Sequence, residues 1–286
     1  MNHIFQRDIY CHQLINPPAH DRRCNIDLQL SKSDGLIEFQ RKYLTSPESV
    51  YSIRLCNIQQ LGFTSTEQHA LEHEFRNLIL ACNLVIQRTC ITDKKVEFPT
   101  YEIVREQNES EVKAKKIDNL TQVNIVQNID TYEKIHTVVI ITENIDEKLI
   151  IAVFRKLQKI NRYNMPRSST VYDMNLNSSL EHYEQAMSEF SKLFKFRNMF
   201  NALEKLVNID GKDITGEDFD TEAMKLDPKN CTQVKKWRNF YTRIKHVQRN
   251  PNDIRTYEQG EKDLRDELEC SRRAVQGILL SKLNSM

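Results

Sequence analysis

The chain has 286 residues, enough for two cores of moderate size, and its 41 Lys and Arg nearly balance its 40 Asp and Glu, giving a formal net charge of +1. A charge this small creates no global field that would draw the protein to a nucleic acid or a membrane, so any such attraction must be local. The six glycines are too few and too scattered for a P-loop or a dinucleotide-binding turn. These folds are therefore not expected, and no cofactor is expected.

Cysteine usage and hydropathy bear on the compartment. The seven cysteines are an odd number, widely spaced and without a Cys-x-x-Cys pair, which is typical of reduced thiols. No apolar run approaches the roughly 18 residues of a spanning helix, and the N-terminus lacks the pattern of a signal peptide. We expect a soluble cytoplasmic protein with no membrane partner.

The first part of the chain predicts strands and one helix. Residues 1–46 are rich in polar residues and alternate only weakly around 26–30, so we expect an irregular arm with one strand. Residues 50–58 alternate better and predict a strand. Apolar residues at steps of three and four then predict a helix over 65–89.

Three extended stretches follow this helix, at 96–104, 122–129 and 135–141. The last is so continuously apolar and β-branched that it predicts a buried central strand. The charged segment 105–116 between them predicts a solvated loop or a short helix. Residues 1–165 are therefore expected to form an N-terminal mixed α and β region.

The apolar period changes to that of helices after Pro166. A turn is expected at 208–211, and 213–227 predicts a loop with short helical pieces. The expected helices cover 177–208, 230–247 and a third segment that starts at 253 or 256 and ends at 283. The predicted fold class is thus α+β, with an all-α bundle over 166–286 as a second domain.

The strongest hint of function is a cluster of cations around His246. Between Asn230 and Asn252 there is no Asp or Glu, whereas charges are mixed elsewhere in the chain. A run of cations on one helix, next to an imidazole and three aromatic rings, can hold a phosphodiester. The cations are Lys235, Lys236, Arg238, Arg243, Lys245 and Arg249.

The C-terminal half resembles the HEPN superfamily, in particular the branch near the Apea-like and methylamine-utilisation-associated groups. The resemblance rests on 193–206 of an early helix, and on Arg238-Asn239 and 241–246 of a later one. It covers 166–286 and implies a helical bundle that dimerises and acts as a ribonuclease, in a toxin or antiviral defence setting. Active members carry an arginine, a polar residue, and then a histidine after four to six positions.

The resemblance also implies residue roles. His246 would be the general acid or base in metal-independent RNA cleavage, and Arg238 or Arg243 would neutralise the scissile phosphate. Arg238 precedes His246 by eight positions and Arg243 by three, and helical rotation allows either arginine to share a face with the histidine. The supporting residues would be Asn239 and Tyr241 as hydrogen-bond donors, Lys235, Lys236, Lys245 and Arg249 as RNA or phosphate contacts, and Glu204 as a carboxylate that orients an arginine.

A different class of function stays open for the same residues. The cations can form an ordinary solvated helix face, with His246 near a helix C-terminus where a cation is favoured. Glu204 is then simply exposed. The bundle would in that case be a non-catalytic scaffold for dimerisation or for binding a nucleotide or RNA. The aromatic residues of the early helix are expected in the core or a dimer interface, namely Phe190, Phe194, Phe196 and Phe200.

No metal site is predicted. His69 and His73 are four positions apart, but a third ligand is not apparent. The Cys11-His12 pair with His20 and Cys24 matches no standard zinc module.

Overall fold

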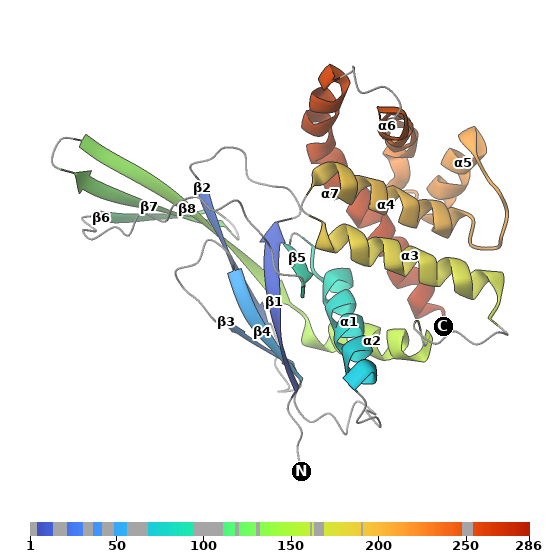
Figure 1. Cartoon of the computed structure of the whole chain (residues 1–286), viewed down its shortest axis with the longest axis horizontal. Coiled ribbons are helices and arrows are strands. Elements are labelled where there is room, and N and C mark those ends of the chain that lie inside the picture. The colour runs from blue at the N-terminus through green and yellow to red at the C-terminus, as the bar shows by residue number, and fades with distance from the viewer. Residues whose placement is uncertain are drawn as a thin grey trace, which may run out of the picture. The chain divides into compact units, whose positions relative to one another are not determined.

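The computed structural model describes residues 5–13, 22–30, 37–41, 49–55, 68–87, 89–93, 111–117, 120–129, 132–160, 162, 169–189, 191–247 and 254–286. The chain forms two compact units, which Figure 1 draws in ribbon form. The strand unit comprises Met1–Gln13, Pro17–Ser65 and Arg88–Lys148, and the helical unit comprises Leu14–Asn16, Thr66–Gln87 and Leu149–Met286. Content is thus mixed, with strands in the N-terminal half and a mostly helical C-terminal half.

The first sheet of the strand unit contains four antiparallel neighbours in the order β3-β4-β1-β5. Alternate side chains of these strands point into the core, where Ile9, Tyr51 and Ile53 are almost completely buried. The strands are β1 (Phe5–Gln13), β3 (Ile37–Arg41), β4 (Ser49–Leu55) and β5 (Thr89–Thr92).

The second sheet has the order β2-β8-β7-β6, with β2 parallel to β8 and the other pairs antiparallel. Its strand β8 lies between β2 and β7, so the central position predicted for 135–141 is confirmed. The hydroxyl of Tyr51 accepts a hydrogen bond from the Leu28 amide at 3.1 Å and joins the two sheets. The strands are β2 (Arg22–Leu30), β6 (Glu111–Ile117), β7 (Leu120–Ile129) and β8 (Tyr132–Ile145).

Two predictions for this region were wrong. Residues 1–46 contain three strands, not one, and β6 lies where a loop or short helix was expected. Both segments are rich in polar and charged residues, but pairing with a neighbouring strand satisfies their backbone groups, and such context outweighs weak local preference. The stretch 96–104 lies outside the described residues.

The helical unit draws on both halves of the chain. Helix α1 (Gln68–Val85) and most of α2 (Glu147–Ile160) belong to it, although the sequence placed the boundary at 165/166. Its other elements are α3 (Val171–Ser188), α4 (Lys192–Val207), α5 (Gly216–Leu226), the single 3₁₀ turn η2 (Cys231–Gln233), α6 (Val234–Val247) and α7 (Ile254–Asn284). None of the helices that the structure describes is long and apolar enough to cross a membrane.

Side chains of α3 and α7 hold the C-terminal end of α1, which explains why α1 joins this unit. The Tyr183 hydroxyl donates to the Asn83 carbonyl at 2.7 Å. Arg272 Nη2 donates to the Ile86 carbonyl at 2.9 Å, and Gln276 Nε2 donates to the same oxygen at 3.0 Å. These donors satisfy carbonyls that the last turn of a helix leaves unpaired, and the arginine charge suits the negative end of the helix dipole.

The single helix predicted over 177–208 is in fact two, α3 and α4. Thr170 and Asp173 form a capping box that starts α3. The chain turns extended at Glu189, and Ser191 takes the N-cap position of α4. Serine side chains compete for backbone hydrogen bonds, and Ser188 donates to the Gln185 carbonyl at 3.1 Å. The spacing of the apolar residues continues across the break between the two helices, so the spacing alone predicted one helix.

The turn predicted at 208–211 is confirmed. Gly211 adopts φ +79, and a Cβ atom there would lie 2.9 Å from Val171 Cγ1, so both conformation and space favour glycine. Helix α5 follows where a loop was expected. Glu217 and Asp218 lie in its first turn, where carboxylates suit the helix dipole, and Phe219 is buried.

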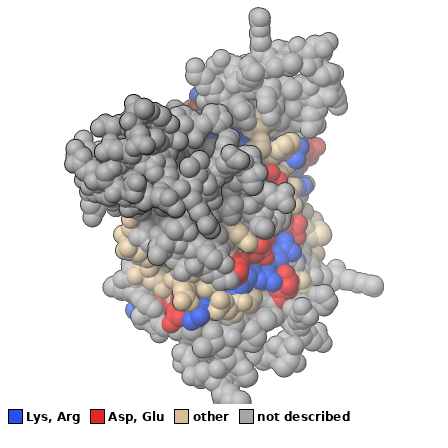
Figure 2. Space-filling model, turned by 60° about the vertical axis from the view of Figure 1, so that its left-hand side comes forward, with Lys and Arg blue, Asp and Glu red and all other residues tan. Residues whose placement is uncertain are grey.

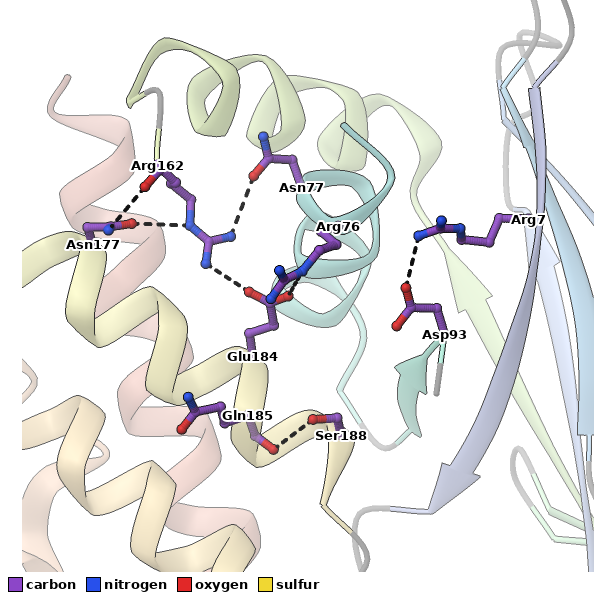
Figure 3. A network of polar contacts seen from close by, with 9 residues as sticks. All are labelled: Arg7, Arg76, Asn77, Asp93, Arg162, Asn177, Glu184, Gln185 and Ser188. Carbon is purple, nitrogen blue, oxygen red and sulfur yellow. Dashed lines mark hydrogen bonds and ion pairs between the residues drawn. The ribbon is translucent and has the colours of Figure 1, made fainter. Parts of the chain in front are cut away.

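A buried arginine links three helices of this unit (Figure 3). Arg162, just after α2, has a side chain only 1% exposed, and its Nη2 pairs with Glu184 Oε2 of α3 at 2.8 Å. Its Nε and Nη1 reach Asn177 Oδ1 at 3.3 Å and Asn77 Oδ1 at 3.5 Å. The second oxygen of Glu184 accepts from Arg76 Nε of α1 at 3.0 Å.

Candidate nucleic-acid interface

Helix α6 carries the predicted site, and its buried face fixes its orientation. The residues on this face recur at steps of three and four, and each is at most 8% exposed: Val234, Trp237, Phe240 and Tyr241. This spacing is that of one helical stripe. The residues Lys235, Lys236, Asn239 and Thr242 between them are exposed.

Aromatic rings join α6 to α4. Phe240 packs edge-on against Phe196 with centroids 6.3 Å apart, and Tyr241 stacks on Phe200 at 4.4 Å. Phe196 and Phe200 are buried, so the prediction that they lie in a core and not on a base-stacking surface is confirmed for this pair.

Phe194 does not lie in the core, and the dimer interface that was also expected for it stays a prediction. Its side chain is 39% exposed, and the Arg197 guanidinium lies over its ring at 4.8 Å. It lies between the buried positions 193 and 196, so the helix turns it outward. Phe190 lies outside the described residues.

Arg238 is committed to an ion pair with α5. Its Nε donates to Asp220 Oδ1 at 2.9 Å and its Nη2 donates to Oδ2 at 2.8 Å, a bidentate geometry. The Asp220 side chain is 9% exposed and that of Arg238 is 26% exposed. Hydrogen bonding to Asp220 raises the pKa of the Arg238 guanidinium, with a smaller contribution from the charge of Glu217. The arginine therefore stays charged and is held toward α5.

Lys236 and Trp237 share one carboxylate of α7. Trp237 Nε1 donates to Glu267 Oε2 at 2.8 Å, and Lys236 Nζ forms an ion pair with Oε1. Glu267 is 5% exposed on its side chain, so these two donors neutralise and satisfy a nearly buried charge. Lys236 remains 51% exposed.

The other described members of the predicted site also make separate contacts. Lys235 Nζ lies 3.8 Å from Glu217 Oε1, a loose pair between side chains that are 69% and 87% exposed. The Tyr241 hydroxyl donates to Asn201 Oδ1 of α4 at 2.5 Å.

The predicted site residues whose side chains the structure describes therefore do not converge on one point. Arg238 contacts α5, Lys236 contacts α7 and Tyr241 contacts α4. The backbone of α6 continues to Val247, so Arg243, Lys245 and His246 belong to this helix, but their side chains lie outside the described residues, as does all of Arg249.

A carboxylate does orient Arg238, but it comes from α5 and not from the position that was expected. Glu204 of α4 does not pair with Arg238, and its expected role toward Arg243 stays a prediction, because the side chain of Arg243 lies outside the described residues. Burial lowers the pKa of His182, and the charge of Lys205 adds to this, while a hydrogen bond to Gln185 and the charges of Glu181 and Glu204 oppose it.

The acids that pair with α6 were missed from the sequence. Glu217 and Asp220 precede the cationic run, and Glu267 follows it. The run itself contains no acid, but these acids of neighbouring helices contact its cations in the folded protein. The acidic stretch 217–222 was the signal that could have indicated these acids. Read as an amphipathic helix, this segment places Phe219 and Ala223 on its buried face.

The metal patterns can be followed only in part. Within the described ranges, no three side chains of His, Cys, Asp or Glu are grouped so that they could hold a metal ion. His20 lies outside the described residues, and for Cys24 and His69 the structure describes the backbone alone.

Comparison with protein families, with curated proteins and with solved structures found no match for this chain.

Proposed function

We propose that the helical unit is a non-catalytic, HEPN-like scaffold that binds RNA through the exposed face of α6. The observation that carries this proposal is the bidentate pair of Arg238 with Asp220. A guanidinium held in this way supports the fold and is not free to follow charge that develops on a scissile phosphate. Of the exposed lysines of the same helix, Lys236 is also held by a nearly buried carboxylate, Glu267, whereas Lys235 makes only a loose, exposed pair with Glu217.

The exposed face of α6 has the chemistry of a phosphate contact. Lys235 and Lys236 are more than half exposed, and Asn239 adds an amide on the same side, whereas the Thr242 hydroxyl donates to the Arg238 carbonyl at 2.9 Å. Positions 243 and 246 follow Asn239 at steps of four and seven, which continue one helical stripe. The stripe could therefore track a backbone over several phosphates.

The charges nearby limit the strength of this binding. Lys235 lies near Glu217 and Lys236 pairs with Glu267, and the described Lys and Arg of the face drawn in Figure 2 likewise lie beside Asp and Glu. Exposed cations with acidic neighbours attract a polyanion weakly, and salt screens the attraction. We therefore propose a scaffold of modest RNA affinity that falls steeply as salt rises.

The test is binding of single-stranded RNA over a range of salt concentrations. Lys235→Ala should weaken binding and reduce the log–log salt slope by about 0.7, the value for one phosphate contact. Lys225→Ala is the matched control, because Lys225 is 64% exposed on α5 and pairs with Glu222 of its own helix. Binding that does not change with salt, or equal losses in both variants, would contradict the proposal.

The second candidate is a metal-independent endoribonuclease, as the HEPN resemblance implies. The observation that favours it is the length of α6, which includes both Arg243 and His246 at a spacing of three. The proposed scaffold should cut no RNA in EDTA. If the wild type does cut, and His246→Ala slows cutting by ~100-fold while RNA affinity is kept, the nuclease replaces the scaffold as the better account.

The resemblance also implies a homodimer and a toxin or antiviral setting. Of the apolar residues that suggested a partner, Phe196, Phe200, Leu203 and Leu206 are buried within one chain, whereas Phe194 is 39% exposed. The prediction of a homodimer therefore depends mainly on the resemblance. Sedimentation equilibrium at micromolar concentration measures the oligomeric state directly.

A further inference from the structure

We propose that α5 regulates the α6 surface, because its carboxylates occupy cations that RNA phosphates would otherwise contact. The inference rests on the proposed RNA-binding function. It concerns the acidic residues Glu217 and Asp220 of α5 and the cations Lys235 and Arg238 of α6.

Helix α5 is strongly acidic, and two of its acids reach the basic helix. Its 11 residues include Glu217, Asp218, Asp220 and Glu222 against a single Lys225. Asp220 binds Arg238 through both oxygens, and Glu217 approaches Lys235 to 3.8 Å. Consecutive turns of α6 thus each present a cation to an acid of α5.

The pairing with Asp220 has the geometry of phosphate recognition. Two parallel N–H donors of a guanidinium fit two oxygens of a carboxylate or of a phosphate equally well. A phosphate can bind Arg238 in this way only after Asp220 has released it. Asp220 is therefore a competitor for the same donors.

The helix dipole of α5 does not account for this arrangement. It favours acids in the first turn, which explains Glu217 and Asp218. Asp220 lies two positions beyond Asp218, and its nearly buried side chain is turned to Arg238. A carboxylate with little access to water needs such a partner, so the pair is specific to these two residues.

Core packing holds α5 in place independently of its ion pairs. Phe219 is 3% exposed and packs on Phe200 at a centroid distance of 5.5 Å, and Ala223 is completely buried. An RNA must therefore compete with fixed carboxylates instead of displacing a loose helix. This arrangement lowers the affinity for short or weakly charged ligands most, because they offer few other contacts.

The test compares three isosteric variants of the full-length protein by single-stranded RNA binding. Asp220→Asn should raise the affinity about 3- to 10-fold and steepen the log–log salt slope by about 0.7, because Arg238 gains a phosphate contact. Glu217→Gln should raise the affinity about 2-fold, since its pair is loose and exposed. Glu222→Gln removes the same charge from α5 but touches Lys225, and should leave the affinity unchanged.

The outcomes separate this inference from the function on which it rests. If the wild type binds RNA with the expected salt dependence but neither Asp220→Asn nor Glu217→Gln binds more tightly than Glu222→Gln, the regulation by α5 is wrong and the scaffold stands. If neither the wild type nor any of the three variants binds RNA, the proposed function itself is wrong. Glu217 is 87% exposed, so its variant tests the inference even if Asp220→Asn impairs folding.

Discussion

At the scale of single residues, Glu184 shows how burial decides what an ion pair contributes. It holds two arginines at similar distances, Arg162 at 2.8 Å and Arg76 at 3.0 Å. The Arg162 side chain is 1% exposed, whereas that of Arg76 is 45% exposed. An exposed pair gains little, because water and salt already solvate both charges. Removing one partner of a buried pair leaves the other charge without compensation and leaves acceptor atoms without a donor.

We therefore predict different costs for two arginine variants around the same carboxylate. Arg162→Ala should lower the free energy of unfolding by about 3–5 kcal/mol, because Glu184 loses its buried partner and two asparagines lose a donor. Arg76→Ala should cost at most about 1 kcal/mol. Urea denaturation of both variants measures the difference. Equal costs would show that the network in Figure 3 does not carry the stability assigned to it.

His182 predicts a pH dependence of stability. Burial lowers its pKa from the ordinary 6.5, and its buried Nδ1 finds no hydrogen-bond partner. At a pH between the lower pKa of the folded state and the pKa of the unfolded state, the unfolded state binds more protons. The free energy of unfolding therefore falls as the pH drops below about 6.5, and it stops falling once the pH is below the pKa of the folded state. His182→Gln should remove this part of the decline between pH 7 and pH 5. Unchanged pH dependence in thermal unfolding would contradict the assignment.

At the scale of elements, the helices of the C-terminal half were predicted better than their ends. The spacing of apolar residues located α6 and α7 well, because one face of each is buried. It did not show the break between α3 and α4, since the apolar period runs on through the extended residue Glu189 at which the first helix ends. Periodicity reports which face is buried, whereas caps decide where a helix stops.

The candidate site was predicted less completely than the fold, and for a different reason. The sequence identified α6 as cationic, but ion pairs form between residues that are distant in sequence. Asp220 is 18 positions from Arg238, and Glu267 is 30 positions from Trp237. No local sequence pattern predicts which carboxylate pairs with which cation. Which cations of α6 are held in ion pairs therefore became clear only from the packing of α5 and α7 against it.

At the scale of the whole molecule, the helical unit is discontinuous in sequence. Its α1 precedes Arg88–Lys148, which belongs to the strand unit, and α2 follows that segment. The contacts that depend on α1 are buried: Tyr183, Arg272 and Gln276 all donate to carbonyls at its C-terminal end. Without α1 these three donors would face either water or an apolar core, and burying them unpaired is costly.

This arrangement predicts that 166–286 alone does not fold as a stable bundle. The fragment retains Arg272 and Gln276 but lacks the carbonyls of α1, so it should melt without a cooperative transition and bind a hydrophobic dye. A matched fragment should restore cooperative melting, namely 66–87 joined to 149–286 by a Gly/Ser linker of about 20 residues, which spans roughly 25 Å. Differential scanning calorimetry compares the two. If 166–286 melts as cooperatively and at the same temperature as the joined fragment, the bundle folds without α1 and α2. The boundary at 165/166 that the sequence predicted would then describe the folding unit better than the boundary drawn from the contacts.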